Sequence, residues 1–245
     1  MESIVIPNSA SKIEDSSFKD NTELKSVLIP SSVTEIGAGA FHGCTSLESI
    51  IIPNSVEIIG PKAFCGCTNL RYMVIPTIDS QMRSLSIGGG AFSDCVNLES
   101  VLIPNSESVV IGPYAFFRCN KLKSFAAYNY DNPSNNMGMG WLCEWAFCMC
   151  ESLERVILPD SILHIENCAF GLCKSLSSIT LPQKLFTIGE MSFYNCETLA
   201  TVDLPDTVYA VGKNAFLKCP SLKTIKCSNP NALAGAKLRK AIKII

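Results

Sequence analysis

Residues 24–47 read LKSVLIPSSVTEIGAGAFHGCTSL, and residues 47–70 read LESIIIPNSVEIIGPKAFCGCTNL. The two stretches share Leu, an aliphatic-x-aliphatic-Pro segment, a further aliphatic residue before Gly, and Ala-Phe-x-x-Cys. Aliphatic residues two apart face the same side of a strand, so Val27 and Ile29 are predicted to be buried. Pro30 then ends the strand, because proline has no N–H for a ladder.

The same pattern recurs along the chain. Its aliphatic-Pro pairs end at Pro7, Pro30, Pro53, Pro76, Pro104, Pro159, Pro182 and Pro205, with successive gaps of 23, 23, 23, 28, 55, 23 and 23 residues. One degenerate unit, in which Tyr128 stands in place of Pro, lies inside the gap of 55 residues. A fixed period of this length is typical of a solenoid, in which each unit packs on its neighbours and has no stable core of its own.

The rest of each unit carries the chain back to the next strand. Gly follows the second aliphatic position at residues 37, 60, 88, 112, 189 and 212. We expect a left-handed backbone there, because Gly adopts it at little cost. Ala-Phe-x-x-Cys suggests one helical turn, with the Phe side chains filling the core.

In these repeats the chain resembles the BspA-like class of leucine-rich repeats, whose units have the form LxxIxIPxxVxxIgxxAFxxCxxL. The resemblance covers residues 2–228, nearly the whole chain. It implies an α/β leucine-rich-repeat solenoid that is right-handed, with a parallel β-sheet on one face and short helical turns or loops on the others. It also implies a surface that binds other proteins and no catalytic activity.

We expect two parts in the chain. Residues 1–228 are predicted to form a solenoid of nine to ten 23-residue units, with insertions near 77–90 and 126–140. Residues 229–245 are predicted to form a C-terminal capping helix, because apolar residues recur among basic ones at positions 233, 238, 242 and 245.

Composition excludes several classes of protein. Hydrophobic residues make up 47% and charged residues 17%, which favours a folded chain with a sizeable core. A net charge of −2 argues against a nucleic-acid partner, and no apolar run approaches the roughly 18 residues of a membrane span. The start has no signal-peptide pattern. We therefore expect a cytoplasmic protein as given, or a cell-surface protein if an upstream signal or anchor was removed.

The sequence contains 13 cysteines, and eight of them lie three residues after a repeat Phe. This position indicates a row of small buried residues with reduced thiols rather than a disulfide framework. Cys143, Cys148 and Cys150 lack the paired spacing of a zinc site, so we expect no metal and no cofactor. The two histidines, His42 and His164, lie in distant units, and no nucleophile elbow or phosphate-binding loop is present. We expect no enzyme.

The first candidate binding site is an outward row on the predicted strands. For most of the chain the residue two before each Pro position is aliphatic: Val5, Leu28, Ile51, Val74, Leu102 and Ile157. Tyr72 lies in the neighbouring outward row and is a further candidate. A continuous aliphatic stripe often marks a binding site. Strand propensity alone explains it equally well, so both interpretations stay open.

The second candidate is the inserted loop 126–141, which contributes Tyr128, Tyr130 and Trp141. Aromatic residues are enriched at interface hot spots, although solenoids also tolerate such insertions without any role. The sequence thus predicts a non-enzymatic protein–protein interaction module that binds a protein through the strand face and this loop. The alternative is a cell-surface protein of the adhesin type that contacts host or matrix proteins.

Overall fold

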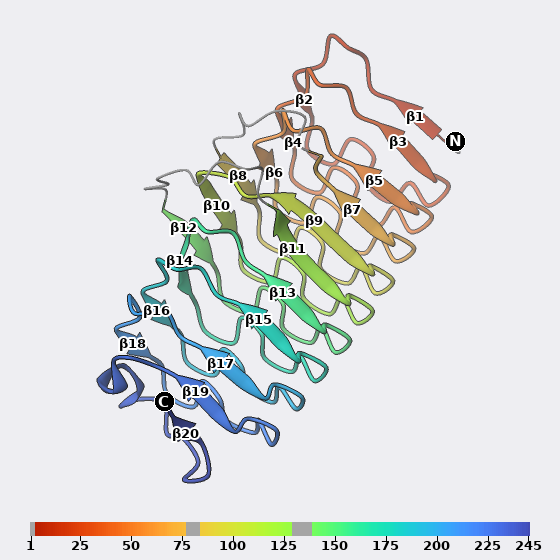
Figure 1. The fold of residues 1–245 in the computed structure, drawn as a ribbon. Helices are drawn as coiled ribbons and strands as arrows, with labels where there is room; N and C mark the ends of the chain where they lie inside the picture. The colour runs from red at the N-terminus through yellow and green to blue at the C-terminus, as the bar shows by residue number, and fades with distance from the viewer. Residues whose placement is uncertain (1–2, 77–83, 129–138) are drawn as a thin grey trace.

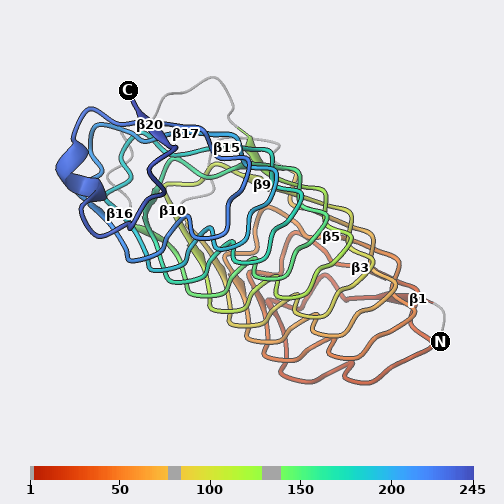
Figure 2. The same cartoon turned by 90° about the horizontal axis from the view of Figure 1, so that it is seen from below.

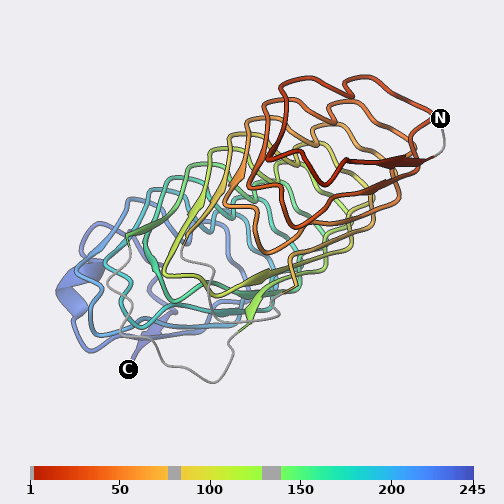
Figure 3. The same cartoon turned by 90° about the horizontal axis from the view of Figure 1, so that it is seen from above.

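The computed structural model describes residues 3–76, 84–128 and 139–245. Within them the chain winds into a parallel β-solenoid whose turns stack along one axis (Figures 1, 2 and 3). One wall holds the strands that precede each Pro position: β1 (Ser3–Val5), β3 (Ser26–Leu28), β5 (Ser49–Ile51), β7 (Tyr72–Val74), β9 (Ser100–Pro104), β11 (Ser124–Tyr128), β13 (Arg155–Ile157), β15 (Ser178–Thr180), β17 (Thr201–Asp203) and β19 (Thr224–Lys226). The predicted parallel sheet on this face is confirmed. We call it the first wall.

A second parallel sheet lies along another wall, where the sequence predicts only a turn. Its strands each end on the aliphatic residue before the Gly position: β2 (Lys12–Ile13), β4 (Glu35–Ile36), β6 (Ile58–Ile59), β8 (Ser84–Ile87), β10 (Ser108–Ile111), β12 (Gly140–Leu142), β14 (Ile162–Ile165), β16 (Thr187–Ile188) and β18 (Ala210–Val211). Several are only two residues long, too short to show an alternating pattern in the sequence. We call this sheet the second wall.

The core between the walls is built on a stack of Phe rings. Neighbouring rings lie nearly parallel, with centroids 5.0–5.4 Å apart from Phe18 to Phe216. This spacing is close to the distance between adjacent strands. Each repeat therefore adds one ring to a continuous apolar column.

The helical turn predicted at Ala-Phe-x-x-Cys is wrong. Two residues of each unit have positive φ there, such as Tyr114 (58°) and Arg118 (59°), and left-handed residues interrupt a right-handed helix. The backbone bonds to the next turn instead, as where the N–H of Phe41 donates to the carbonyl of Ala63 at 2.7 Å. The α part of the predicted α/β class is therefore not found in the described residues beyond one short 3₁₀ turn.

The predicted reason for the repeated Gly is also wrong. Gly60 and Gly212 do not have positive φ. A Cβ on Gly60 would lie 2.6 Å from the backbone nitrogen of Ala38 in the preceding turn, and one on Gly212 would lie 2.4 Å from that of Glu190. Gly is needed because the turns approach too closely for a side chain.

The C-terminal segment differs from the predicted capping helix. Only Pro230–Leu233 is helical, as the 3₁₀ turn η1, and the chain then returns to form strand β20 (Lys243–Ile244) beside β19. Ala232, Leu233 and Ala236 are buried, and Leu238 and Ile242 pack against the core. The segment covers the last turn with irregular backbone rather than with one amphipathic face.

Candidate interaction surface

The outward aliphatic residues of the first wall lie on adjacent strands in register. Val5 pairs with Leu28, and within the described residues no ladder joins Leu28 to Ile51 on the next strand. From Ile51 the register continues through Val74, Leu102, Ala126 and Ile157, each paired with the one before it. Val5, Leu28 and Ile51 are the most exposed, at 69%, 64% and 66%. The structure thus brings the predicted row together as one narrow apolar surface, which we call the aliphatic stripe.

The stripe becomes polar toward the C-terminal end. Thr180 pairs with Ile157, and Asp203 on the next turn pairs with Lys226 on the turn after it. The Lys226 ammonium lies 2.8 Å from the Asp203 carboxylate on the outer surface. Tyr72 lies beside the stripe, 46% exposed, between Ser49 and Ser100 of the neighbouring strands.

Of the aromatic residues predicted at the inserted loop, Tyr128 and Trp141 lie on different walls. Tyr128 ends β11, and its hydroxyl donates to the carbonyl of Ile75 at 2.7 Å, so it anchors the corner between the two walls. Tyr130 lies outside the described residues. Trp141 belongs to β12 on the second wall and is stacked on His164 with ring centroids 4.2 Å apart. The stripe and Trp141 therefore lie on different sheets.

The second wall carries an exposed aromatic row that sequence reasoning missed. From Trp141 and His164 it continues to Phe186, at 6.0 Å from the imidazole, and to Tyr209, 6.3 Å further. Tyr209 is 61% exposed. The available signal was the aromatic residue shortly before the Gly position in LFTIG and VYAVG.

The cysteine row lines the core side of the turn. Each Sγ lies 3.0–3.3 Å from the carbonyl oxygen of the repeat Phe one turn earlier, as Cys67 does on Phe41. Burial raises the pKa of the Cys44 thiol to about 11, and that of the Cys148 thiol to about 12. A thiol with such a pKa holds little thiolate at neutral pH, so Cys44 and Cys148 are unreactive in the folded protein. Cys219 is an exception within the row, because a hydrogen bond with Cys196 lowers the pKa of its thiol.

Most of the 13 cysteines are expected to be free, and the row should react with a thiol reagent only as the protein unfolds. The half-exposed Cys65, Cys143 and Cys168 should react first in the native protein. The measurement is thiol counting with and without denaturant, in the absence of reductant. Recovery of six disulfides would contradict the role of the row as buried S–H donors.

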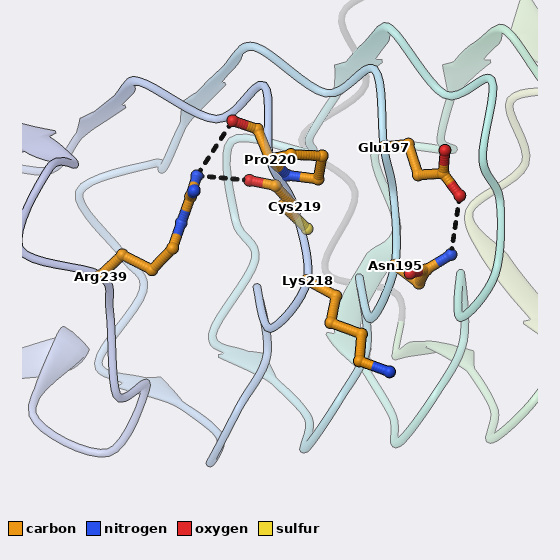
Figure 4. Close-up of a pocket in the computed structure, with 6 residues that line it drawn as sticks. All are labelled: Asn195, Glu197, Lys218, Cys219, Pro220 and Arg239. Carbon is orange, nitrogen blue, oxygen red and sulfur yellow. Dashed lines mark hydrogen bonds between the residues drawn. The ribbon is translucent and has the colours of Figure 1, made fainter.

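A shallow pocket at the C-terminal end is lined by Asn195, Glu197, Lys218 and Arg239 (Figure 4). The guanidinium Nη2 of Arg239 lies 2.6 Å from the carbonyl of Cys219 and 3.2 Å from that of Pro220. In internal turns the carbonyl equivalent to Pro220 accepts an N–H from the following turn, as Asn120 does from Ser152. Arg239 therefore supplies the donor that a further turn would have supplied.

Replacing Arg239 by Ala is expected to lower the free energy of unfolding by about 1–2 kcal/mol, because terminal carbonyls lose a charged donor. Urea denaturation measures this loss, and faster amide exchange in residues 219–226 should accompany it. Replacing the adjacent, exposed Lys240 by Ala is the control and should change stability by less than about 0.5 kcal/mol. Equal effects of both changes would contradict the capping role.

Within the described residues, no group of three or more His, Cys, Asp or Glu side chains is placed to hold a metal ion. None of the helical segments in that part of the chain has the length and apolar character of a membrane span. Further surface cavities in the described part of the chain lie beside Ser178 and Thr201 on the first wall, and beside Ser16 and His42 near the N-terminal end.

The chain matches the model of the BspA type leucine-rich repeat region, in six copies, over residues 1–123 and 142–237. No curated protein sequence matches it. Among solved structures it is similar to the pneumococcal vaccine antigen PcpA, with 25% identity, a TM-score of 0.52, and coverage of 94% of this chain and 62% of that one.

Two further solved structures are similar to the chain. A leucine-rich repeat protein from Eubacterium ventriosum is 20% identical, with a TM-score of 0.50 and coverage of 90% of this chain and 77% of that one. A leucine-rich repeat protein from Bacteroides ovatus is 24% identical, with a TM-score of 0.42 and coverage of 100% and 77%.

Proposed function

Because the chain belongs to the BspA-type leucine-rich repeat family, we propose that it is a non-enzymatic module that binds a protein partner across the aliphatic stripe. Leucine-rich repeat proteins are typically protein-interaction modules, which gives the proposal its general form. The site residues are those of the stripe, with Tyr72 at its edge: Val5, Leu28, Ile51, Val74, Leu102 and Ile157.

The observation that carries the proposal is the exposure of Val5, Leu28 and Ile51, each about two-thirds accessible on neighbouring strands. Single exposed apolar residues need no explanation, but an aligned row of them does. A partner that covers such a row removes apolar surface from water, which stabilises the complex by about 25 cal/mol per Å² buried. The adjacent hydroxyl groups of Ser26 and Ser49 would contribute a polar rim.

The inserted loop is a weaker part of the proposal. Tyr128 is held by Ile75, so its hydroxyl already has an acceptor. Trp141 is 39% exposed on the second wall, and a partner on the stripe would have to reach round the corner to contact it. We therefore place the main contact on the first wall and treat Trp141 as a separate site to be tested.

The test is an affinity pull-down from the source cell with the whole chain as bait, followed by binding measurements on the captured protein. The Ile51→Glu and Val74→Lys double variant should lower the affinity for that partner at least about tenfold, or 1.4 kcal/mol. These side chains point outward, and each change places a charge in the apolar contact. Thermal denaturation should show the variant folded.

The matched control is the double variant Ile58→Glu and Ser86→Lys, which makes the same kind of change at paired outward positions of the second wall. Its affinity should equal that of the wild type. Loss of binding through Trp141→Ala alone would move the site to the second wall. A partner that binds both double variants and Trp141→Ala normally would contradict the proposed site.

A cell-surface role of the adhesin type is the second candidate, because BspA-type proteins are often found on cell surfaces. An antibody against the folded chain tests it on the source cell. Labelling of intact cells would favour the surface role, and labelling only after permeabilisation would favour an intracellular partner.

A further inference from the structure

The first wall has an open seam near its C-terminal end. β15 (Ser178–Thr180) pairs with β13, and β17 (Thr201–Asp203) pairs with β19, but in the described part of the chain no ladder joins β15 to β17. The seam is short, because Thr198 N–H donates to Lys174 before it and the Thr207 hydroxyl donates to Gln183 after it. Residues 178–180 and 201–203 therefore lie on neighbouring strands that no ladder joins.

The turns on either side of the seam stay stacked at the core. β16 and β18 of the second wall pair through Thr187 and Ala210, and the rings of Phe193 and Phe216 lie 5.4 Å apart. The opening is therefore confined to the outer surface.

A surface cavity of about 310 Å³ lies over this seam. Its lining is dominated by hydroxyl groups, including Ser178, Thr180 and Thr201, with the amide of Gln183 and the Asp203–Lys226 ion pair. Ile179 and Leu181 contribute the apolar part. The volume is at the lower end of the range of small-molecule sites.

The chemistry of this lining favours one class of ligand. Asp203 and Lys226 bond to each other at 2.8 Å, so they offer an acceptor and a donor but little net charge. The hydroxyls of Ser178, Thr180 and Thr201 add further donors and acceptors. We propose that the cavity at the β15–β17 seam is a binding subsite for one ring of a neutral carbohydrate. This inference is independent of the protein partner proposed for the stripe.

A second gap in the first wall, between β3 and β5, serves as an internal comparison. There the flanking outward residues are Leu28 and Ile51 together with Ser26 and Ser49, and the Glu48 N–H still donates to the carbonyl of Lys25. Half of the outward side chains at this gap are thus aliphatic, whereas those at the β15–β17 seam all carry a polar group. The β15–β17 seam therefore offers more partners for the hydroxyl groups of a sugar.

The experiment is an NMR titration of the whole ¹⁵N-labelled chain with glucose, galactose, mannose and N-acetylglucosamine, each added singly. We expect at least one sugar to bind with a dissociation constant on the order of 1 mM, as suits a ligand of so few atoms. The shifted amides should be those of residues 177–183 and 200–204. An uncharged extended peptide, acetyl-tetra-alanine amide, is titrated separately to test whether the cavity binds a peptide strand instead of a sugar.

Two double variants test the site by separate routes. Thr180→Val with Thr201→Val removes the hydroxyls at nearly constant shape, and Asp203→Ala with Lys226→Ala removes the ion pair at constant net charge. Each should weaken the sugar at least about tenfold, whereas Ser26→Ala with Ser49→Ala at the β3–β5 gap should leave it unchanged. Absence of shifts with all four sugars, shifts elsewhere on the molecule, or binding of the peptide alone would overturn the inference.

Discussion

Replacing Phe116 or Phe147 by Ala is expected to lower the free energy of unfolding by about 3–5 kcal/mol, the largest loss from any single substitution proposed for this protein. Both rings are fully buried, stacked 5.0 Å apart, and each also contacts the edge of Phe125. Truncation would leave a cavity that neighbouring turns cannot close without shifting register. Urea denaturation of the two variants measures the loss.

The matched controls are Phe18 and Phe216, which lie at the two ends of the column and each stack on one other ring. Replacing either by Ala should cost about 1–3 kcal/mol, because in a stacked solenoid each unit is stabilised by its nearest neighbours. Equal losses at all four positions would mean that stability does not arise from the ring column.

The double variant Ile50→Glu and Met73→Lys is expected to unfold the domain. Both side chains point into the core, with 2% and 0% of their surface exposed, and neither charge would find water there. Buried charges cost several kcal/mol each, which is comparable to the whole stability of a domain. Circular dichroism at room temperature should show loss of the β signal.

Its control lies one residue further along the same two strands. Ile51→Glu and Val74→Lys changes the outward neighbours and should melt within about 1 kcal/mol of the wild type. The pair of variants therefore tests the facing of the first wall directly. Folding of the inward variant, or unfolding of the outward one, would contradict the strand register.

The repeat and its buried rows could be predicted from the sequence, because Pro30 or Phe41 marks a fixed place in every unit. The second wall could not, since a strand such as Glu35–Ile36 is too short to carry a period. The Ala-Phe-x-x-Cys segment is not helical because residues such as Lys62 and Tyr114 have left-handed backbone. Their side chains are not of the types that usually adopt this conformation, so it could not be predicted from the sequence.

Candidate site residues were predictable only where the repeat places them. Ile51 and Val74 lie where the unit pattern sets every outward residue, and the structure shows them side by side. Trp141 follows an insertion, so its sheet could not be deduced from the 23-residue period. The bond from Tyr128 to Ile75 joins residues 53 positions apart, and nothing local in the sequence indicates it.

Because the Phe rings are evenly spaced, the length of the solenoid grows in equal steps with the number of units. Each unit, with or without an insertion, adds one ring to the column at a spacing of 5.0–5.4 Å and packs on its neighbours as the other units do. Duplicating or deleting a whole unit would therefore change the reach of the outer surface in fixed increments without changing its cross-section. The length of the outer surface and the cross-section of the solenoid can therefore change independently during evolution.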